Sequence, residues 1–240
     1  MKSWARALVL AAAVLSTTAC ADEASVKKAL TERFAGMPVE KISKAPMKGW
    51  YEVYADGQLF YTDEKANYLF IGNVIDAKSR ESLTEKRLEQ LSAIQPARLP
   101  LEQAVKIVRG DGSRQLIVFS DPDCPFCKKL ERELQQLNNL TVYVFLYPLD
   151  SLHPQARKKA QRVWCASDRA AAWLALMLEN QAPDNNGDCD NPVQATVLLA
   201  EKLGIRGTPA LIFPNGRKVS GAVPAAEIER LLRETEKSKK

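Results

Sequence analysis

Cys124 and Cys127 lie between a short apolar run and a segment with a helical pattern. This position at a strand-to-helix junction is the sequence feature that most constrains the fold. The apolar run lies in residues 115–120 and carries Leu-Ile-Val-Phe, which is typical of a buried central strand. Residues 124–137 are expected to form the helix that follows. At its first turn, free N–H groups and the helix dipole stabilise a thiolate on Cys124. One turn brings Cys127 within disulfide reach, so we expect Cys124 to be an exposed nucleophile and Cys127 a more buried resolving thiol.

The residues beside this pair act in opposite directions. Pro125 suits the start of a helix, because its missing N–H costs little at that position. Asp123 places a carboxylate next to the nucleophile, and a neighbouring negative charge disfavours a thiolate. The helix start and Asp123 therefore have opposing effects on the reactivity of Cys124.

Three other uses of a Cys-X-X-Cys pair compete with redox chemistry. Haem attachment needs a histidine directly after the motif, and residue 128 is lysine. A zinc site needs a second close pair of ligands, whereas Cys165 and Cys189 are far apart and have no histidine near them. A structural disulfide is the third alternative, although a bridge across two residues restricts the unfolded chain little. The sequence favours redox chemistry, and we expect no metal and no cofactor.

Cys165 and Cys189 have a different character. Cys165 lies in a helical stretch beside Trp164, and Cys189 lies in the polar loop 184–190. A bridge between them would close a loop of about 25 residues and contribute about 3.5 kcal/mol to stability. We interpret it as a structural disulfide that resists mild dithiothreitol because one end is buried against Trp164. A regulatory bridge is the alternative.

Thr208 and Pro209 directly precede the apolar residues 210–213, which are expected to form another strand. A proline before a buried strand suits a turn or a cis peptide bond. We expect a cis bond that faces the cysteines, with Thr208 offering its backbone to an extended substrate peptide. Thr-Pro alone is a weak signal, and a trans loop is the alternative.

The pattern along residues 96–240 predicts an α/β domain. A second buried strand is expected over residues 141–147, and a helical stretch over 155–180 is expected to break near Ser167. Strands followed by helices indicate a sheet that is covered on its faces. Before this domain, residues 82–95 begin with a capping-box pattern and are expected to form a linker helix.

Residues 22–81 are expected to form a smaller α+β domain. Apolar residues at a spacing of four predict a helix over residues 24–34. Asp56-Gly57 predicts a hairpin turn, and residues 67–75 form a third strand candidate. This domain has no cysteine and no cluster of histidines or acids, so its expected role is structural or associative.

Residues 1–21 have the pattern of a cleaved signal peptide. Lys2 and Arg6 precede the apolar residues 7–15, and small residues flank Cys20 before the expected cleavage site. A membrane anchor and a lipidated Cys20 are the alternatives. Cleavage would leave four of the five cysteines in an exported protein, which suggests disulfide chemistry.

Composition excludes two functional classes. The net charge of +5 is spread along the chain, so nucleic-acid binding has little support. The chain has a single histidine, His153, which excludes a His-rich metal site.

Three motifs together resemble those of the DsbC and DsbG family of thiol:disulfide interchange proteins. They are Phe119–Leu130 around the cysteines, Trp164-Cys165-Ala166, and Gly204–Ala210 with its Thr-Pro pair. The resemblance extends over most of the chain after residue 21. It implies an α/β thioredoxin-like catalytic domain and a cystatin-like N-terminal dimerisation domain, joined by a linker helix.

The resemblance also implies roles for individual residues. Cys124 and Cys127 match the redox pair, and Pro209 matches the cis-proline of the family. Cys165 and Cys189 match the second disulfide of DsbC-type members. The dipeptide Pro-Phe inside the motif departs from the Gly-Tyr familiar in DsbC and is closer to the Pro-Tyr of DsbG.

By the same resemblance, the protein is a periplasmic V-shaped homodimer that reshuffles wrong disulfides in misfolded secreted proteins. Its active form must be the dithiol, which implies a reducing membrane partner, in this family the transmembrane reductase DsbD. We expect the dimer contact at residues 67–75, where Gly72 would let two backbones approach closely. Two alternatives remain: a holdase chaperone without an essential redox role, and a DsbG-like chaperone and reductase of sulfenylated cysteines.

Overall fold

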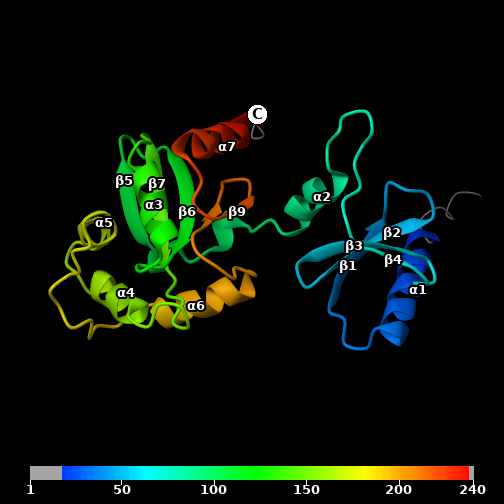
Figure 1. The fold of residues 1–240 in the computed structure, drawn as a ribbon, viewed down its shortest axis with the longest axis horizontal. Coiled ribbons are helices and arrows are strands. Elements are labelled where there is room, and N and C mark those ends of the chain that lie inside the picture. The colour runs from blue at the N-terminus through cyan, green and yellow to red at the C-terminus, as the bar shows by residue number, and fades with distance from the viewer. Residues whose placement is uncertain (1–17, 238–240) are drawn as a thin grey trace, which may run out of the picture. The chain divides into compact units, whose positions relative to one another are not determined.

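The structure is a computed structural model that describes residues 18–237, and the chain divides into two units, residues 1–91 and 92–240 (Figure 1). Residues 18–21 form the first turn of the first helix, and the rest of the expected signal peptide lies outside the described residues. Among residues 18–237, no helix is long and apolar enough to cross a membrane.

The first unit is a helix packed on a four-stranded antiparallel sheet of strand order β1-β2-β3-β4. Its elements are α1 (Thr18–Arg33), β1 (Val39–Lys44), β2 (Trp50–Ala55), β3 (Gln58–Asp63) and β4 (Leu69–Phe70). Val26 and Leu30 are fully buried in its core, as predicted, whereas Phe34, the third residue of the predicted apolar face, follows the end of α1 and is 38% exposed. Asp56 and Gly57 both have positive φ, as a tight hairpin turn between β2 and β3 requires.

The strand expected over residues 67–75 is shorter than predicted. Only Leu69 and Phe70 pair with β3, and Ile75 forms an isolated bridge with Ser82. After β4 the backbone pairs with residues 81–83 rather than with β3: the N–H of Leu83 donates to the carbonyl of Val74 at 2.8 Å, and the N–H of Asp76 donates to that of Glu81 at 2.9 Å. The N–H of Val74 donates to the Thr84 hydroxyl at 2.8 Å.

The helix after this segment, α2 (Leu83–Leu91), belongs to the first unit. The Ser82 hydroxyl accepts the N–H of Glu85 at 3.1 Å, which confirms the start expected from the capping-box pattern. Arg87 pairs with Glu52 on β2 at 2.5 Å. The helix is therefore tied to the sheet of the first unit.

The second unit contains a five-stranded mixed sheet of order β5-β7-β6-β8-β9. The strands are β5 (Val105–Arg109), β6 (Arg114–Ser120), β7 (Leu140–Leu146), β8 (Ala210–Ile212) and β9 (Lys218–Ser220). The helices are α3 (Pro125–Leu134), α4 (Ala156–Trp164), α5 (Arg169–Glu179), α6 (Val193–Lys202) and α7 (Ala225–Lys237), with short 3-10 helices at Pro96–Arg98 and Leu101–Gln103. β6 and β7 are parallel and confirm the two predicted buried strands, whereas β5 was not anticipated.

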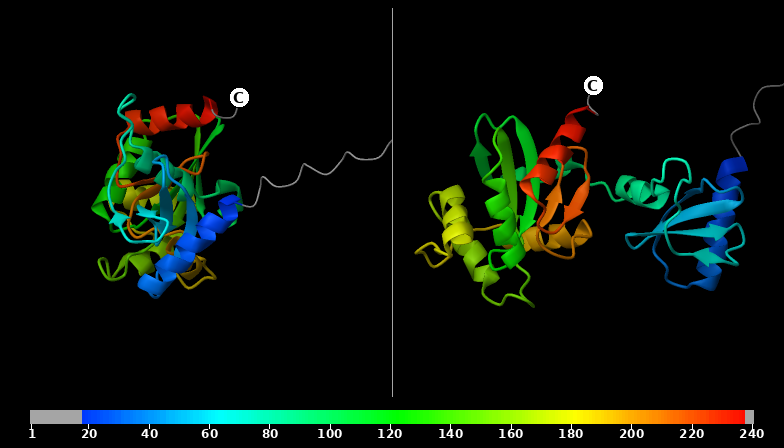
Figure 2. Two further views of the ribbon diagram at one scale, coloured as in Figure 1. Left: turned by 90° about the vertical axis from the view of Figure 1, so that its right-hand side faces the viewer. Right: turned by 45° about the horizontal axis from the view of Figure 1, so that its top comes forward.

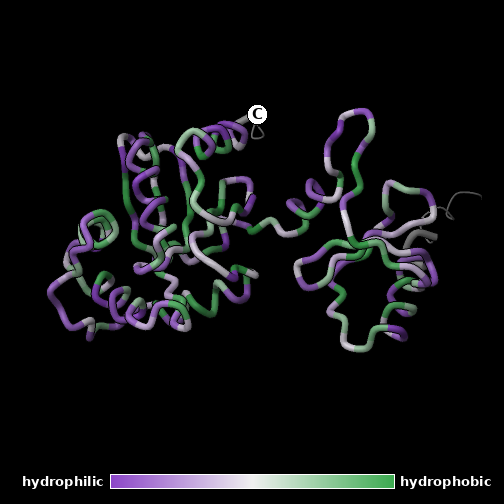
Figure 3. The backbone as a smooth tube through the Cα atoms, viewed as in Figure 1, coloured by the Kyte–Doolittle hydropathy of each residue, from purple (hydrophilic) through white to green (hydrophobic). Residues whose placement is uncertain are grey.

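Alternate residues of the central strands separate two apolar layers. Leu116 and Val118 of β6 pack with side chains of α3, α5 and α7, while Ile117 and Phe119 pack with α6 and the segment before β5. Figure 2 shows these helices on the two faces of the sheet, and Figure 3 shows apolar residues along the central strands. The sheet is therefore covered on both faces, as the sequence predicted.

Candidate active site

Sheet pairing brings the two predicted site segments together. Phe119 near the end of β6 pairs with Ala210, the first residue of β8. The chain therefore leaves β6 towards Cys124 next to the point where Thr208 and Pro209 enter β8. The carbonyl oxygen of Thr208 lies 3.5 Å from the Cys124 sulfur, and the Thr208–Pro209 peptide bond is cis.

Cys124 occupies the position directly before α3, with extended backbone angles and Pro125 at the first helical position. The expectation that Cys124 is exposed is wrong, because its residue surface is only 5% accessible, against 1% for Cys127. The sulfur is covered because Cys124 packs in the apolar layer that also holds Cys127, with the Thr208 carbonyl against it. Phe126 between them is 64% exposed and supplies the open apolar surface of the motif.

The two thiols have opposite ionisation behaviour. A hydrogen bond from the Cys127 side chain lowers the pKa of Cys124 to about 5 against the effect of burial, with smaller contributions from the backbone N–H of Cys127, the Thr208 side chain and the backbone N–H of Phe126. Burial, followed by the neighbouring Cys124, raises the pKa of Cys127 well above its ordinary value. At neutral pH the reduced site therefore holds a thiolate on Cys124 and a proton on Cys127.

A fully buried carboxylate, Asp121, organises the turn before α3. One of its oxygens accepts the N–H groups of Asp123 at 2.7 Å and Cys124 at 3.2 Å. The other accepts the N–H of Leu149 at 2.7 Å and lies 3.1 Å from Nδ1 of His153. The backbone N–H of Asp121 itself donates to the Cys127 sulfur at 3.4 Å.

The roles of Asp121 and His153 were not predicted from the sequence. A signal for Asp121 was available. An aspartate two or three residues before the start of a helix often accepts the backbone N–H groups of the residues two and three positions later, and so forms a side-chain-capped turn. The second acid, Asp123, contacts the ammonium group of Lys159 on α4. Its carboxylate therefore does not face Cys124 as an uncompensated charge.

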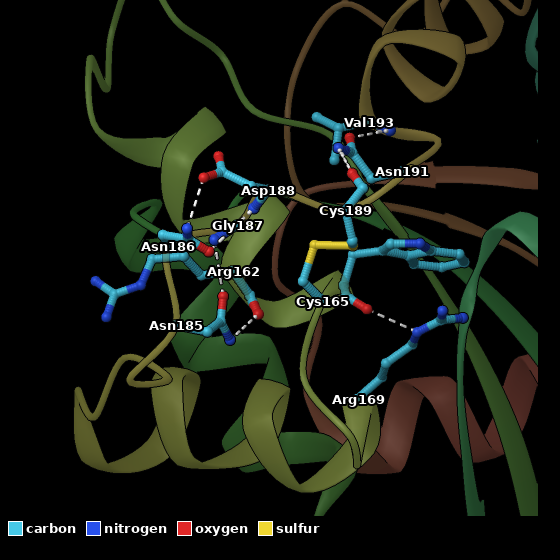
Figure 4. Close-up of a disulfide and its surroundings, with 11 residues drawn as sticks. Arg162, Cys165, Arg169, Asn185, Asn186, Gly187, Asp188, Cys189, Asn191 and Val193 are labelled. Atoms are coloured by element: carbon cyan, nitrogen blue, oxygen red, sulfur yellow. Dashed lines mark hydrogen bonds between the residues drawn. A yellow bond between two sulfur atoms is a disulfide. The ribbon is translucent and has the colours of Figure 1, made fainter.

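The structure joins Cys165 and Cys189 in a disulfide with a Cα–Cα distance of 5.7 Å (Figure 4). Cys124 and Cys127 are free thiols. Cys165 is partly exposed and Cys189 is exposed, so the expected burial of one end is wrong. The reason is position: Cys165 follows the last turn of α4, and Cys189 lies in a surface loop.

Hydrogen bonds fix that loop onto α4. The side chain of Asn185 donates to the carbonyl of Arg162 at 2.9 Å and accepts the N–H of Gly187 at 2.9 Å. Arg169 donates to the Trp164 carbonyl at 2.8 Å, and its guanidinium lies 3.6 Å from the centroid of the Trp164 ring. The disulfide therefore closes a loop that is already ordered by polar contacts.

Comparison with known proteins identifies both units. Residues 101–236 match a thioredoxin-like domain, and residues 17–85 match the N-terminal domain of disulfide bond isomerase proteins. The chain is 43% identical over 208 residues to the "Probable thiol:disulfide interchange protein DsbC" of Bordetella parapertussis, covering 87% of this chain and 73% of the relative. It is 28% identical over 232 residues to the thiol:disulfide interchange protein DsbC of Escherichia coli K12, covering 94% and 93%.

A solved structure supports the same assignment. The disulfide interchange protein of Neisseria gonorrhoeae is 48% identical, with a TM-score of 0.55, over 57% of this chain and 97% of that one. The matched catalytic and N-terminal domains, and the similarity over most of its length, show that this chain belongs to the DsbC family of thiol:disulfide interchange proteins in the thioredoxin superfamily.

Proposed function

We propose that this protein is a disulfide isomerase that uses Cys124 as its nucleophile to reshuffle wrong disulfides in exported proteins. The observation that carries the proposal is the pairing of a Cys124 thiol of pKa about 5 with a Cys127 thiol whose pKa is raised. A thiolate is the attacking form in thiol–disulfide exchange, and a low pKa also makes Cys124 a good leaving group.

The reaction begins when the Cys124 thiolate attacks one sulfur of a substrate disulfide. A Cys124–substrate bond forms, the substrate disulfide breaks, and the released substrate thiolate takes the electron pair of the broken bond. In isomerisation, a substrate thiolate attacks a sulfur elsewhere in the substrate, and a further attack returns Cys124 as the thiolate. No electrons are gained or lost overall.

Cys127 provides the second route. After losing its proton, it attacks the Cys124 sulfur, releases the reduced substrate thiol and leaves a Cys124–Cys127 disulfide. Because burial raises the pKa of Cys127, this step is slow relative to attack by an ionised substrate thiol. The raised pKa therefore favours reshuffling over net reduction.

Thr208 and Pro209 are proposed to hold the substrate chain beside the sulfur. The Thr208 carbonyl is 3.5 Å from the Cys124 sulfur, which places a backbone acceptor at the reacting atom. A substrate in extended conformation can pair its N–H groups with such an edge. Cys165 and Cys189 take no part in this exchange and are proposed to be structural.

Each turnover that ends in net reduction leaves the Cys124–Cys127 pair oxidised and requires two electrons. We propose that a membrane reductase of the DsbD type supplies them, and that the protein works in the periplasm after removal of residues 1–21. The domains of the mature chain are then residues 22–81 for dimerisation, 82–95 as the linker, whose helical part is α2 (Leu83–Leu91), and 96–240 for catalysis.

Homodimerisation is proposed to use exposed apolar side chains of the first unit. Ile71 is 75% exposed, and Tyr68, Phe70 and Ile75 are also exposed. Isolated large apolar residues on a surface are ordinary, but several in one short segment mark an interaction site. Ile71→Arg should convert the dimer to monomer in light scattering, while Leu198→Arg, at an exposed apolar residue of the second unit, should not. A monomeric parent would refute this part.

The isomerase proposal is tested with a substrate whose disulfides have been scrambled, such as ribonuclease A. The parent should restore ribonuclease activity, Cys124→Ser should lose this ability, and Cys127→Ser should keep part of it in the presence of a thiol reductant. Suppression of aggregation by Cys124→Ser together with full rescue of scrambled substrate would contradict a redox role and favour a holdase. Reduction of a sulfenylated substrate without any rescue would favour the sulfenic acid reductase; the interchange proteins among the relatives favour isomerisation.

A further inference from the structure

Two aspartates precede the nucleophile, Asp121 by three residues and Asp123 by one, and their surroundings differ. Asp121 is fully buried, accepts three backbone N–H groups, and lies 3.1 Å from His153. Asp123 is adjacent to Cys124 in the chain, and its side chain retains 18% exposure. A negative charge at this position opposes a thiolate on Cys124, because like charges disfavour each other's ionised form.

The position of Asp123 is fixed by the turn that precedes α3. Its backbone N–H is held by Asp121 at 2.7 Å, and the next N–H along the chain, that of Cys124, is held by the same oxygen at 3.2 Å. These bonds fix the main chain of Asp123 beside the start of α3, and the contact with Lys159 holds its side chain. The charge of Asp123 is therefore compensated at the residue next to Cys124.

Lys159 provides that compensation from α4. Its ammonium group contacts a carboxylate oxygen of Asp123, and its side chain is 33% exposed. Its helix is anchored because Ala156, Ala160 and Val163 are fully buried in the core of the second unit. The backbone at Lys159 is therefore held in a fixed position opposite Asp123.

Other basic groups of this region have different partners. Lys128 on α3 donates to Asn180 at 2.6 Å, and Arg157 on α4 pairs with Asp150 at 2.5 Å. His153 lies against Asp121, as described above. Within residues 18–237, Lys159 is the basic side chain that the structure places on the Asp123 carboxylate.

We propose that Lys159 is a positioning residue of the redox site, which neutralises Asp123 and so prevents that carboxylate from opposing the negative charge on the Cys124 sulfur. Lys159 does not touch the reacting atoms; it acts through Asp123. The inference rests on the proposed function, because it assigns to Lys159 a control over the same nucleophile.

The test compares the pKa of Cys124 in the reduced parent and in Lys159→Gln, measured by thiolate absorbance and by the pH dependence of alkylation. Removing the ammonium should raise the pKa of Cys124 by about one unit, which lowers the thiolate fraction about tenfold below that pKa. Lys159→Arg keeps the charge and should restore most of the parent value. Lys158→Gln makes the same change of net charge at the exposed neighbouring position and should leave the pKa unchanged.

A second background shows whether Lys159 acts through Asp123. Asp123→Asn should lower the pKa of Cys124, and in that background Lys159→Gln should have less than about a third of its original effect, because the lysine loses its anchor and returns to solvent. An equal effect in both backgrounds would mean that Lys159 acts directly on the sulfur. No effect in either background would mean that the ion pair is only structural. Either result overturns the proposal.

The rescue assay and the pKa measurement together separate this inference from the proposed function. If the parent fails to rescue scrambled ribonuclease, the proposed isomerase function fails whatever the pKa values are. If the parent is active and Lys159→Gln leaves the pKa of Cys124 unchanged, only the inference fails. Circular dichroism of each variant identifies any that do not fold, and Lys159→Arg and Asp123→Asn then carry the comparison.

Discussion

The low pKa of Cys124 predicts a stability change with pH that only the reduced protein should show. An unfolded cysteine has a pKa of about 8.5, whereas hydrogen bonds lower that of folded Cys124 to about 5. A depressed folded pKa adds stability above the unfolded pKa, and this stability is lost as the pH falls through the folded value. Between these two values, the free energy of unfolding should rise by about 1.4 kcal/mol for each pH unit.

Cys124→Ala provides the reference, because it lacks this ionisation and keeps the other titrating groups. The difference in unfolding free energy between the reduced parent and Cys124→Ala should grow by about 2.5 kcal/mol from about pH 6 to about pH 8. Cys127 does not disturb this window, since its raised pKa keeps the folded thiol protonated there. Urea unfolding followed by tryptophan emission measures both proteins in mild reductant.

A second variant identifies the cause. The Cys127 side chain makes the largest contribution to lowering the pKa of Cys124, so Cys127→Ala should raise that pKa by about one unit or more. The growth of stability with pH should then begin at a correspondingly higher pH. A stability difference that stays constant between about pH 6 and pH 8 would refute the thiolate assignment on which the mechanism depends.

Three further predictions concern stability away from the nucleophile. Replacing both Cys165 and Cys189, which are separated by 24 positions, with serine should lower the free energy of unfolding in urea by about 3.5 kcal/mol. Mild dithiothreitol should reduce only an oxidised Cys124–Cys127 pair, because the low pKa of Cys124 makes it the better leaving group. Alkylation and peptide mapping would show this, and labelling of Cys165 before Cys124 would contradict it. Glu131→Gln should cost about 3 kcal/mol in the same assay, because it removes the buried charge 2.9 Å from Arg109; an unchanged midpoint would refute it. Gly216→Ala should destabilise by about 2 kcal/mol, because φ is +86° and a Cβ would lie 2.2 Å from a main-chain carbonyl oxygen; a parent-like melting temperature would contradict this.

Features with a local signal were predictable from the sequence. The apolar runs of β6 and β7 are continuous, because both faces of these central strands are covered by helices. The hairpin at Asp56-Gly57 and the start of α2 at Ser82 follow from side-chain and backbone preferences that act within four residues. The same holds for Cys124 at the start of α3.

Features that depend on distant partners were not predictable. β5 is an exception, because its alternation of buried and exposed residues and its three β-branched side chains are typical of a half-buried strand, so the sequence did carry a signal for it. β4 is short, and the chain after it bonds to residues 81–84 instead of to β3. The low exposure of Cys124 likewise depends on the Thr208 carbonyl, which only the pairing of β6 with β8 brings near.

The two aspartates before Cys124 show most clearly the difference between what local sequence predicts and what distant contacts decide. From the sequence, Asp123 is only a neighbouring charge that disfavours a thiolate, and Asp121 carries no evident role. In the fold, the segment between β7 and the end of α4 supplies Leu149, His153 and Lys159 to these two acids. Through these contacts Asp121 stabilises the turn before α3, and Asp123 forms an ion pair with Lys159. The reactivity of Cys124 therefore depends on a segment that contributes no atom to the exchange, and changes there can tune the nucleophile while the Cys-Pro-Phe-Cys motif stays intact.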